Sequence, residues 1–210
     1  ANYVHNYFGP SYSNDVIRKT LDKYCISYNH VDNIEKETAK LLSKGNLIAW
    51  FQDKMEFGQR ALGNRSILAD PRNESTKDRV NRSIKYRESF RPFAPAILDE
   101  YKTEFFEIDE NEDVLYMEKV YPIKTEKRKL IPAVTHIDGT GRLQTVKLST
   151  NEKFYKLIDC FRQLTGIPVL LNTSFNLNGE PICCSPTDAI RTFYSSGLDV
   201  LVLSNFIIKK

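Results

Sequence analysis

Four separate blocks of this 210-residue sequence carry side chains that suit an oxyanion site. The first block is EFGQRALGNRS, residues 56–66, in which two glycines let the backbone approach a ligand closely. It is neither a P-loop, because no GK[ST] follows the glycines, nor a dinucleotide fingerprint. A surface turn whose arginines only pair with acids is the alternative, but the clustering of donors favours phosphate binding. These donors are Arg60, Asn64, Arg65 and Ser66.

The second block, KYRESFRPFAP at residues 85–95, alternates cations with aromatic side chains. Its two prolines predict an extended backbone. Such a pattern can stack on a nucleotide base or neutralise a single-stranded nucleic acid. A solvated strand edge with its aromatic side chains turned inward is an equally good interpretation. The cations are Lys85, Arg87 and Arg91, and the aromatic residues are Tyr86, Phe90 and Phe93.

The third block, THIDGTGR at residues 135–142, combines a titratable His136 with Asp138, two glycines and Arg142. A lone histidine is more often structural than catalytic, and Asp138 could equally form a turn. Because His5 and His30 are far away in sequence, a histidine-based metal site is not expected.

The fourth block, LNTSFNLNGEP at residues 171–181, follows the end of an apolar strand, where ligands bind in open α/β sheets. A tight polar turn is the simpler alternative. Amide and hydroxyl groups here, with backbone N–H groups, can form an anion-binding nest. They belong to Asn172, Thr173, Ser174 and Asn176.

Charge is concentrated in one part of the chain. Residues 54–91 contain ten Lys and Arg against five Asp and Glu, a net charge of +5, whereas the whole chain carries +3. Seven of the ten are arginines, whose planar fork can hold a phosphate or carboxylate through two hydrogen bonds. The overall charge is too small to indicate a nucleic-acid partner by itself.

Periodic apolar residues predict the elements that must position these blocks. Helices are expected over residues 35–44 and 151–164, and a third after the N-terminal cap SPTD at 185–188, ending at Gly197. Short apolar strands are expected at residues 47–51, 169–171, 198–203 and 206–208. This alternation predicts one α/β domain with helices covering a sheet of mixed strand direction.

The chain has no run of about 20 apolar residues and no signal peptide, so no membrane association is expected. Its four cysteines form neither a dense disulfide framework nor a CxxC pair, which favours a reducing cytoplasm. Because the chain starts at Ala1 and runs directly into an expected loop, we expect a C-terminal piece of a longer protein.

Taken in order, the blocks resemble the C-terminal region of NodU/CmcH-type (TobZ-like) carbamoyltransferases. The stretches that carry this resemblance are MEFGQRALGNRSILADPR, IKYRESFRPFAPAIL, IPAVTHIDGTGRLQTV and the last 45 residues from GIPVLLNTSFNLNGEP onward. The resemblance as a whole runs from about residue 9 to the end of the chain. One departure is DVLYM at residues 113–117, where the family usually has SP-x-M.

The resemblance implies that residues 1–210 form a YrdC-like α/β domain, a twisted mixed sheet with flanking helices and a basic concave face. In that family it follows a larger Kae-type transferase domain, which this chain does not contain. The family's YrdC-like domain makes carbamoyl adenylate from carbamoyl phosphate and ATP. TSFNLNGEP is similar to the TSAN-containing strand end with which YrdC proteins bind nucleotide.

On this basis we expect a set of cations to clamp the phosphates and the planar carbamate: Arg60, Arg65, Lys85, Arg87 and Arg142. Asn172, Thr173, Ser174 and Asn176 would hold the nucleotide, with Asn64 and Ser66 assisting. His136 would handle a proton or contact phosphate. Mg²⁺ would accompany ATP, bound mainly through phosphate oxygens, with no metal site made by the chain alone. The alternatives are an RNA-binding module and a regulatory domain that binds nucleotide without catalysis.

Overall fold

The computed structural model describes residues 5–86, 88 and 91–210. Its helices are α1 (Asn14–Lys23), α2 (Ile34–Ser43), α3 (Ser75–Val80), α4 (Lys102–Phe105), α5 (Thr125–Arg128), α6 (Glu152–Thr165) and α7 (Pro186–Tyr194), with short turns η1 (Asn81–Lys85), η2 (Asp99–Tyr101) and η3 (Pro132–Val134). Its strands are β1 (Asn29–His30), β2 (Ile48–Phe51), β3 (Arg65–Ala69), β4 (Ala94–Leu98), β5 (Val120–Pro122), β6 (Thr140–Arg142), β7 (Gln144–Val146), β8 (Val169–Ser174), β9 (Val200–Leu203) and β10 (Phe206–Lys209).

Eight strands form one sheet in the order β1-β10-β9-β2-β3-β8-β4-β7, and β5 and β6 form a separate pair. Strand β2 runs parallel to β9, and β4 runs parallel to β7, whereas the other neighbours are antiparallel. The expected mixed sheet is therefore confirmed.

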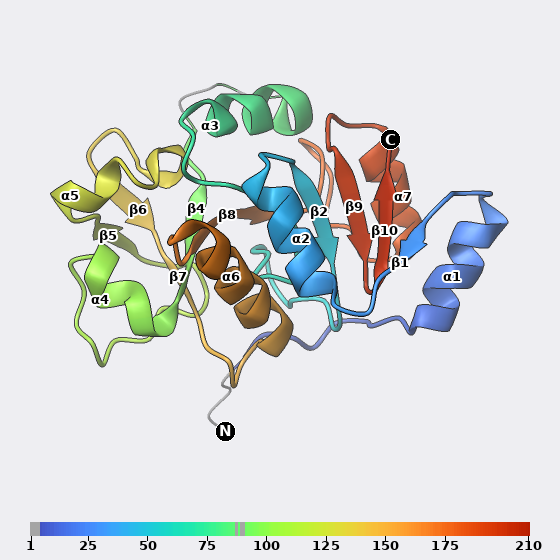
Figure 1. The fold of residues 1–210 in the computed structure, drawn as a ribbon, viewed down its shortest axis with the longest axis horizontal. Helices are drawn as coiled ribbons and strands as arrows, with labels where there is room; N and C mark the ends of the chain where they lie inside the picture. Colours follow the sequence, from blue (N-terminus) through green and yellow to red (C-terminus); the bar gives the residue numbers. More distant parts are fainter. Residues whose placement is uncertain (1–4, 87, 89–90) are drawn as a thin grey trace.

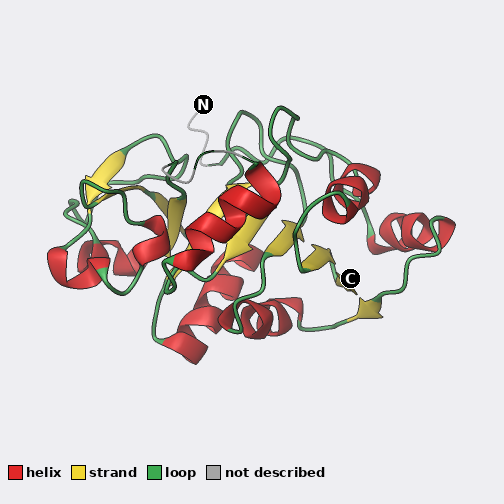
Figure 2. Ribbon diagram, turned by 90° about the horizontal axis from the view of Figure 1, so that it is seen from above, coloured by secondary structure: helices red, strands yellow, loops and turns green. Residues whose placement is uncertain are grey.

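Helices cover both faces of this sheet. Figure 1 shows α2 and α6 side by side in front of it, with α7 behind the strands at its right. Seen from above in Figure 2, the strands lie between helices. Every residue of β2, β3, β4 and β9 is buried, as expected for strands packed on both faces.

The predicted helices and strands have close counterparts. The helix expected at 35–44 is α2, that at 151–164 is α6, and the Ser185 capping box begins α7 as predicted. Strands β3 and β4, each immediately next to a predicted site block, had no counterpart among the expected elements. The polar first residues of β3 hid that strand in the sequence pattern. The prolines of the second block predicted an extended backbone but did not identify β4 as a strand of the sheet.

The topology brings distant segments to one end of the sheet. Strand β8 finishes at Ser174, and both of its neighbours are antiparallel to it, so β3 and β4 start beside that end. The loop before β3 and the segment before β4 therefore arrive at the carboxyl end of β8. The first, second and fourth sequence blocks meet there for this reason.

The loop before β3 packs tightly on α6. Gly63 has a φ of 108°, and a Cβ atom on it would lie 2.2 Å from Cδ1 of Phe154. Gly45 has a similar φ of 84° but open space around it. Gly45→Ala should therefore lower the free energy of unfolding only through backbone strain at this positive φ, by about 1–2 kcal/mol.

We expect Gly63→Ala to lower the free energy of unfolding by about 1–3 kcal/mol more than Gly45→Ala does, because the added methyl group overpacks the contact with Phe154. Urea unfolding of the two variants measures the difference directly. Equal destabilisation of both would contradict the close approach of this loop to α6.

Candidate functional site

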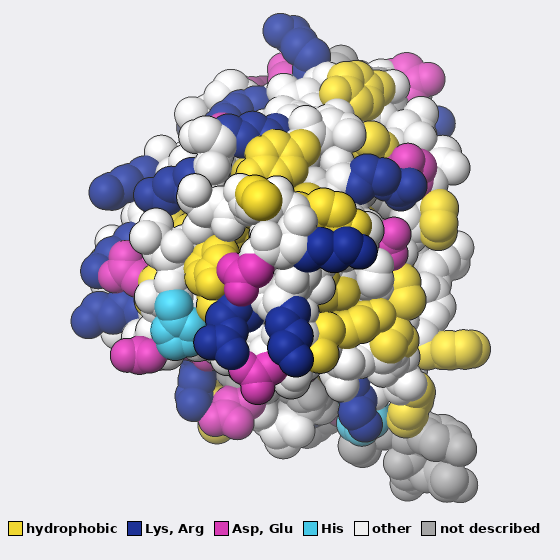
Figure 3. All heavy atoms as spheres, turned by 90° about the vertical axis from the view of Figure 1, so that its right-hand side faces the viewer, with side chains coloured by type: hydrophobic (Ala, Val, Ile, Leu, Met, Phe, Trp, Pro, Cys, Tyr) yellow, Lys and Arg dark blue, Asp and Glu magenta, His cyan; other side chains and the backbone are white. Residues whose placement is uncertain are grey.

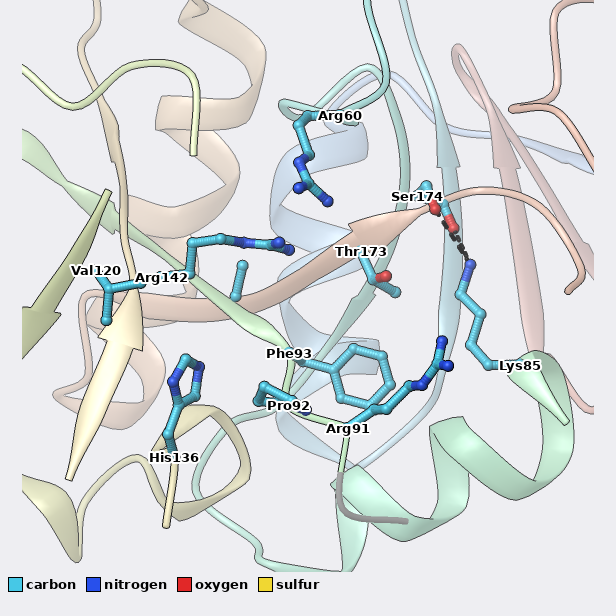
Figure 4. Close-up of a pocket in the computed structure, with 11 residues that line it drawn as sticks. Arg60, Lys85, Arg91, Pro92, Phe93, Val120, His136, Arg142, Thr173 and Ser174 are labelled. Atoms are coloured by element: carbon cyan, nitrogen blue, oxygen red, sulfur yellow. Dashed lines mark hydrogen bonds between the residues drawn. The ribbon is translucent and has the colours of Figure 1, made fainter. Parts of the chain in front are cut away.

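A cavity of about 440 Å³ opens at the carboxyl end of β8. Its lining comes from five segments: the loop before β3, the end of η1, the segment leading into β4, the β5–β6 pair with the turn between its strands, and the last residues of β8. The lining residues are Arg60, Lys85, Arg91, Pro92, Phe93, Ala94, Val120, His136, Arg142, Thr173 and Ser174. Figure 4 shows cationic side chains converging on it from several sides.

Lys85 ties η1 to the end of β8. Its Nζ donates to the carbonyl oxygens of Ser174 at 2.7 Å and Asn176 at 3.0 Å, and to the Asn176 Oδ1 at 2.7 Å. The Ser174 hydroxyl lies 3.3 Å from the same ammonium and donates to the Asn176 Oδ1 at 2.7 Å. Although Lys85 is only 5% exposed, its charge is well solvated by these oxygens. Lys85 thereby holds in place part of the fourth block, the segment that we predicted to bind nucleotide.

Three arginines bring further positive charge to the cavity. Arg60 enters from the loop before β3, Arg91 from the segment before β4, and Arg142 from β6. The Arg142 Nη2 lies 3.6 Å from the Met117 Sδ, and Arg91 pairs with Glu88 at 3.2 Å. Arginine carries five N–H donors and no acceptor, so this side of the cavity presents donors to an anion.

His136 occupies a tight turn at the edge of the cavity. Its backbone N–H donates to the Thr140 carbonyl at 2.8 Å, and its Nδ1 lies 3.1 Å from the Thr140 hydroxyl. That hydroxyl donates to the Asp138 carboxylate at 2.7 Å. Burial of the ring lowers the pKa of His136 below its usual 6.5, and nearby Arg142 and Lys77 lower it further, against the opposing effect of Asp138. The imidazole is therefore neutral at pH 7.

The loop that carries Arg60 is organised by a buried carboxylate. Glu56 is 3% exposed, and its Oε1 accepts from the backbone N–H groups of Leu62 at 2.7 Å, Asn64 at 2.8 Å and Arg65 at 3.2 Å. Trp50 Nε1 donates to the Gly63 carbonyl at 2.8 Å. These hydrogen bonds fix the loop backbone over residues 62–65, close to Arg60, whose side chain lines the cavity.

Not all of the predicted residues reach the cavity. Arg65 is fully buried, stacks on the Phe51 ring at 3.6 Å, and donates to backbone carbonyls that include those of Pro10 and Asp53. Burial lowers its pKa to about 10, so it remains charged at pH 7. We correct the expectation that Arg65 grips a phosphate, because its guanidinium points into the protein and holds the N-terminal segment.

Three further residues that we predicted to bind nucleotide instead support the loop before β3. Asn64 bonds to Lys54 and Asn151, and Ser66 accepts from the Gly63 N–H at 3.1 Å. Asn172 is 1% exposed and donates to the Ala61 carbonyl at 3.2 Å. All three are buried and lie outside the cavity lining. They stabilise the loop before β3. Because they lie outside the cavity lining, they are not placed to make the nucleotide contacts expected of them.

Most of the remaining predicted site residues lie around the cavity. The structure brings Arg60, Lys85, His136, Arg142, Thr173 and Ser174 together around the cavity, with Asn176 beside Lys85. Arg87 lies outside the described residues. Arg91 and Glu56 were missed as site residues. Arg91 stood in the second block as one of three cations, and Glu56 was the single acid in the first block, which could have signalled an internal acceptor.

The basic run at 54–91 does not form one continuous strip. Arg65 is buried, Arg72 pairs with Asp70 at 2.6 Å, and Arg79 pairs with Asp199 at 2.6 Å. Figure 3 shows Lys and Arg side chains interspersed with acids and apolar side chains on the face at the right of Figure 1. The charge pattern that suggested RNA binding is therefore divided between the core, surface ion pairs and the cavity.

Within the described ranges, no group of three or more His, Cys, Asp or Glu side chains is placed to hold a metal ion. No helix among the same residues has the length and apolar character needed to cross a membrane.

Glu56→Gln tests the anchor of the loop before β3. Removing the charge weakens three buried hydrogen bonds, so we expect a loss of about 1–3 kcal/mol in the free energy of unfolding. The control is Glu152→Gln, which alters an exposed ion pair with Lys156 in the first turn of α6 and should have a much smaller effect. Chemical denaturation followed by fluorescence gives both values, and similar losses would contradict the role of Glu56.

The chain matches the family model described as "Carbamoyltransferase C-terminus" over residues 39–210. It is 45% identical to nodulation protein NolNO of Sinorhizobium fredii, covering 97% of this chain and 31% of that protein. It is 37% identical to the 3'-hydroxymethylcephem-O-carbamoyltransferase of Amycolatopsis lactamdurans, covering 80% of this chain and 32% of that protein. The chain thus spans about a third of the length of these relatives.

Two solved structures share its fold. Full-length HypF, described in a phosphate- and nucleotide-bound form, matches with a TM-score of 0.60 at 19% identity, over 83% of this chain and 25% of HypF. Escherichia coli YciO matches with a TM-score of 0.52 at 13% identity, over 88% of this chain and 91% of YciO. The predicted YrdC-like fold is confirmed, and the chain belongs to the carbamoyltransferase C-terminal domain family.

Proposed function

We propose that this chain is the carbamoyl-adenylate-forming domain of an O-carbamoyltransferase of the NodU/CmcH type. The observation that carries the proposal is the cavity at the carboxyl end of β8, where Arg60, Lys85, Arg91 and Arg142 converge. Two comparisons support it: a relative is named as an O-carbamoyltransferase, and HypF, 25% of which matches this fold, is described in a phosphate- and nucleotide-bound form.

The cavity suits small phosphorylated ligands. Its volume of about 440 Å³ falls within the usual range for small-molecule sites. Cations held in place before the reaction stabilise the negative charge that develops at the α-phosphorus without reorganising at that moment. We assign Arg60, Arg91 and Arg142 to the phosphates and the carbamate, and the Thr173 and Ser174 hydroxyls to the nucleotide. The assignment of Arg87 stays a prediction.

The proposed reaction has two steps. Water first converts carbamoyl phosphate to carbamate and phosphate. A carbamate oxygen then attacks the α-phosphorus of ATP, and the bond from that phosphorus to the bridging oxygen breaks, so that pyrophosphate leaves. Among the described residues, no carboxylate belongs to the cavity lining, which agrees with Mg²⁺ being held by phosphate oxygens and water. Holding the carbamate in line with phosphorus supplies part of the rate.

The carbamoyl group would then pass, with AMP leaving, to the hydroxyl of an acceptor substrate bound by a second domain of the longer protein, which we expect to be of the Kae type. The cytoplasmic location inferred from cysteine usage stays a prediction.

Arg142→Ala tests the cationic cavity. Loss of one well-placed donor should reduce carbamoyl-phosphate-dependent pyrophosphate release from ATP by about 10²–10³-fold. Arg162→Ala is the matched control, because Arg162 pairs with Asp159 on α6, outside the cavity lining, and should leave the rate unchanged. A coupled pyrophosphate assay and calorimetric binding of ATP and carbamoyl phosphate measure these effects.

Absence of binding of both ATP and carbamoyl phosphate by the native chain would overturn the proposal. Binding of ATP without pyrophosphate release in the full-length protein would instead identify a regulatory nucleotide-binding domain.

A further inference from the structure

The imidazole of His136 contains a buried nitrogen with unused hydrogen-bonding capacity. Its Nε2 is shielded from solvent and has no hydrogen-bond partner among the described residues, although the residue lines the cavity. An orphaned buried polar atom costs free energy, so such an atom in a native protein calls for a functional explanation. Because Nε2 is closed to water in this structure, a cavity ligand that supplies its missing partner must shift the atoms that cover it.

The surrounding hydrogen bonds determine which imidazole nitrogen carries the proton. An ionised carboxylate only accepts, so the single hydroxyl proton of Thr140 is committed to Asp138 at 2.7 Å. The Thr140 oxygen must then accept from the His136 Nδ1, 3.1 Å away. Because the ring is neutral at pH 7, its Nδ1 carries the proton and its Nε2 carries a lone pair.

This tautomer places an obligatory acceptor in a cavity of donors. The guanidinium and ammonium groups that line the cavity can only donate, and the Ser174 hydroxyl already donates to Asn176. Figure 4 shows the His136 ring below Arg142 on the same side of the cavity. A ligand group that presents an oxygen and an N–H on one carbon would satisfy both side chains at once.

We propose that His136 is the specificity-determining residue for the carbamoyl group, whose NH₂ donates to Nε2 while its oxygen accepts from Arg142. Asp138 and Thr140 act as positioning residues that fix the tautomer. The inference rests on the proposed function, since it concerns the substrate read by that cavity. It assigns His136 the part of a neutral acceptor, which differs from a phosphate contact.

Carbamoyl phosphate and acetyl phosphate form the decisive ligand pair, because they differ by replacement of NH₂ with CH₃. A site built to pair with an N–H rejects an analogue that lacks it, because the acceptor stays unpaired. The native chain should therefore bind carbamoyl phosphate about 100-fold more tightly than acetyl phosphate, the order of magnitude expected when one buried acceptor is left unpaired.

His136→Phe should reduce this preference to within about threefold, because it retains a ring but removes the acceptor. ATP affinity should not change. The control is His30→Phe, in β1 and outside the cavity lining, which should keep the full preference. Calorimetry with both acyl phosphates and ATP supplies these numbers, and thermal unfolding checks that each variant is folded.

Thr140→Val and Thr140→Ser test the positioning residues without altering the imidazole. Valine removes the acceptor for Nδ1–H and should lower the carbamoyl preference, whereas serine should restore it. The chain has only three histidines, so ¹⁵N NMR can assign the His136 ring and report its tautomer. We expect the Nδ1–H form in the native chain and in Thr140→Ser, and a mixture of tautomers in Thr140→Val.

The possible outcomes separate this inference from the proposed function. Binding of ATP and carbamoyl phosphate without preference over acetyl phosphate would overturn the role of His136 and leave the function standing. An Nε2–H tautomer in the native chain would overturn it equally. A loss of ATP affinity in His136→Phe, with the acyl preference intact, would show that Nε2 contacts the nucleotide. Absence of binding of all three ligands would overturn both proposals.

Discussion

The site depends on one buried carboxylate, that of Glu56. A single oxygen of this group accepts from three backbone N–H groups within four residues, at Leu62, Asn64 and Arg65. A buried negative charge is costly unless it is paired and hydrogen-bonded, and here the loop before β3 provides the donors while Arg65 provides the nearby positive charge. The loop therefore adopts the conformation that solvates the Oε1 atom of Glu56, and the position of Arg60 follows from it.

The same constraint explains why arginines of one block have opposite roles. Arg65 is the first residue of β3, and its side chain turns inward over the Phe51 ring, where backbone carbonyls take up its donors. Arg60 lies in the middle of the loop, away from the strand, and lines the cavity. The direction of each side chain depends on the strand boundary and on a partner ring, and residue type alone carries neither. Donor counting in the sequence could not separate them.

What the sequence pattern predicted well was local. The periodic helices α2 and α6, the capping box of α7, and the apolar strands β2, β9 and β10 depend on neighbours in sequence, and each was placed within a few residues. Strands β3 and β4 were missed because their extended form is imposed by pairing with β8, which is distant in sequence.

Asn172 shows the same limit for the site. It lies two residues before the end of β8, where it is buried and bonded to Gln144 and Ala61, whereas Thr173 and Ser174 beyond it line the cavity. The prediction of a polar strand end was useful, but the position of each residue relative to the strand end decides which polar groups a ligand can reach.

Affinity and selectivity have different physical sources in this cavity. Cations attract any phosphate or carboxylate, so Arg60, Arg91 and Arg142 together raise affinity for acyl phosphates as a class. They cannot distinguish an amino group from a methyl group, because neither accepts a hydrogen bond from them in a planar acyl group. Discrimination requires an acceptor, and a carboxylate in that place would neutralise the cations beside it. A neutral imidazole with a fixed tautomer provides a lone pair without negative charge, which is the kind of group that a cationic cavity can tolerate at its edge.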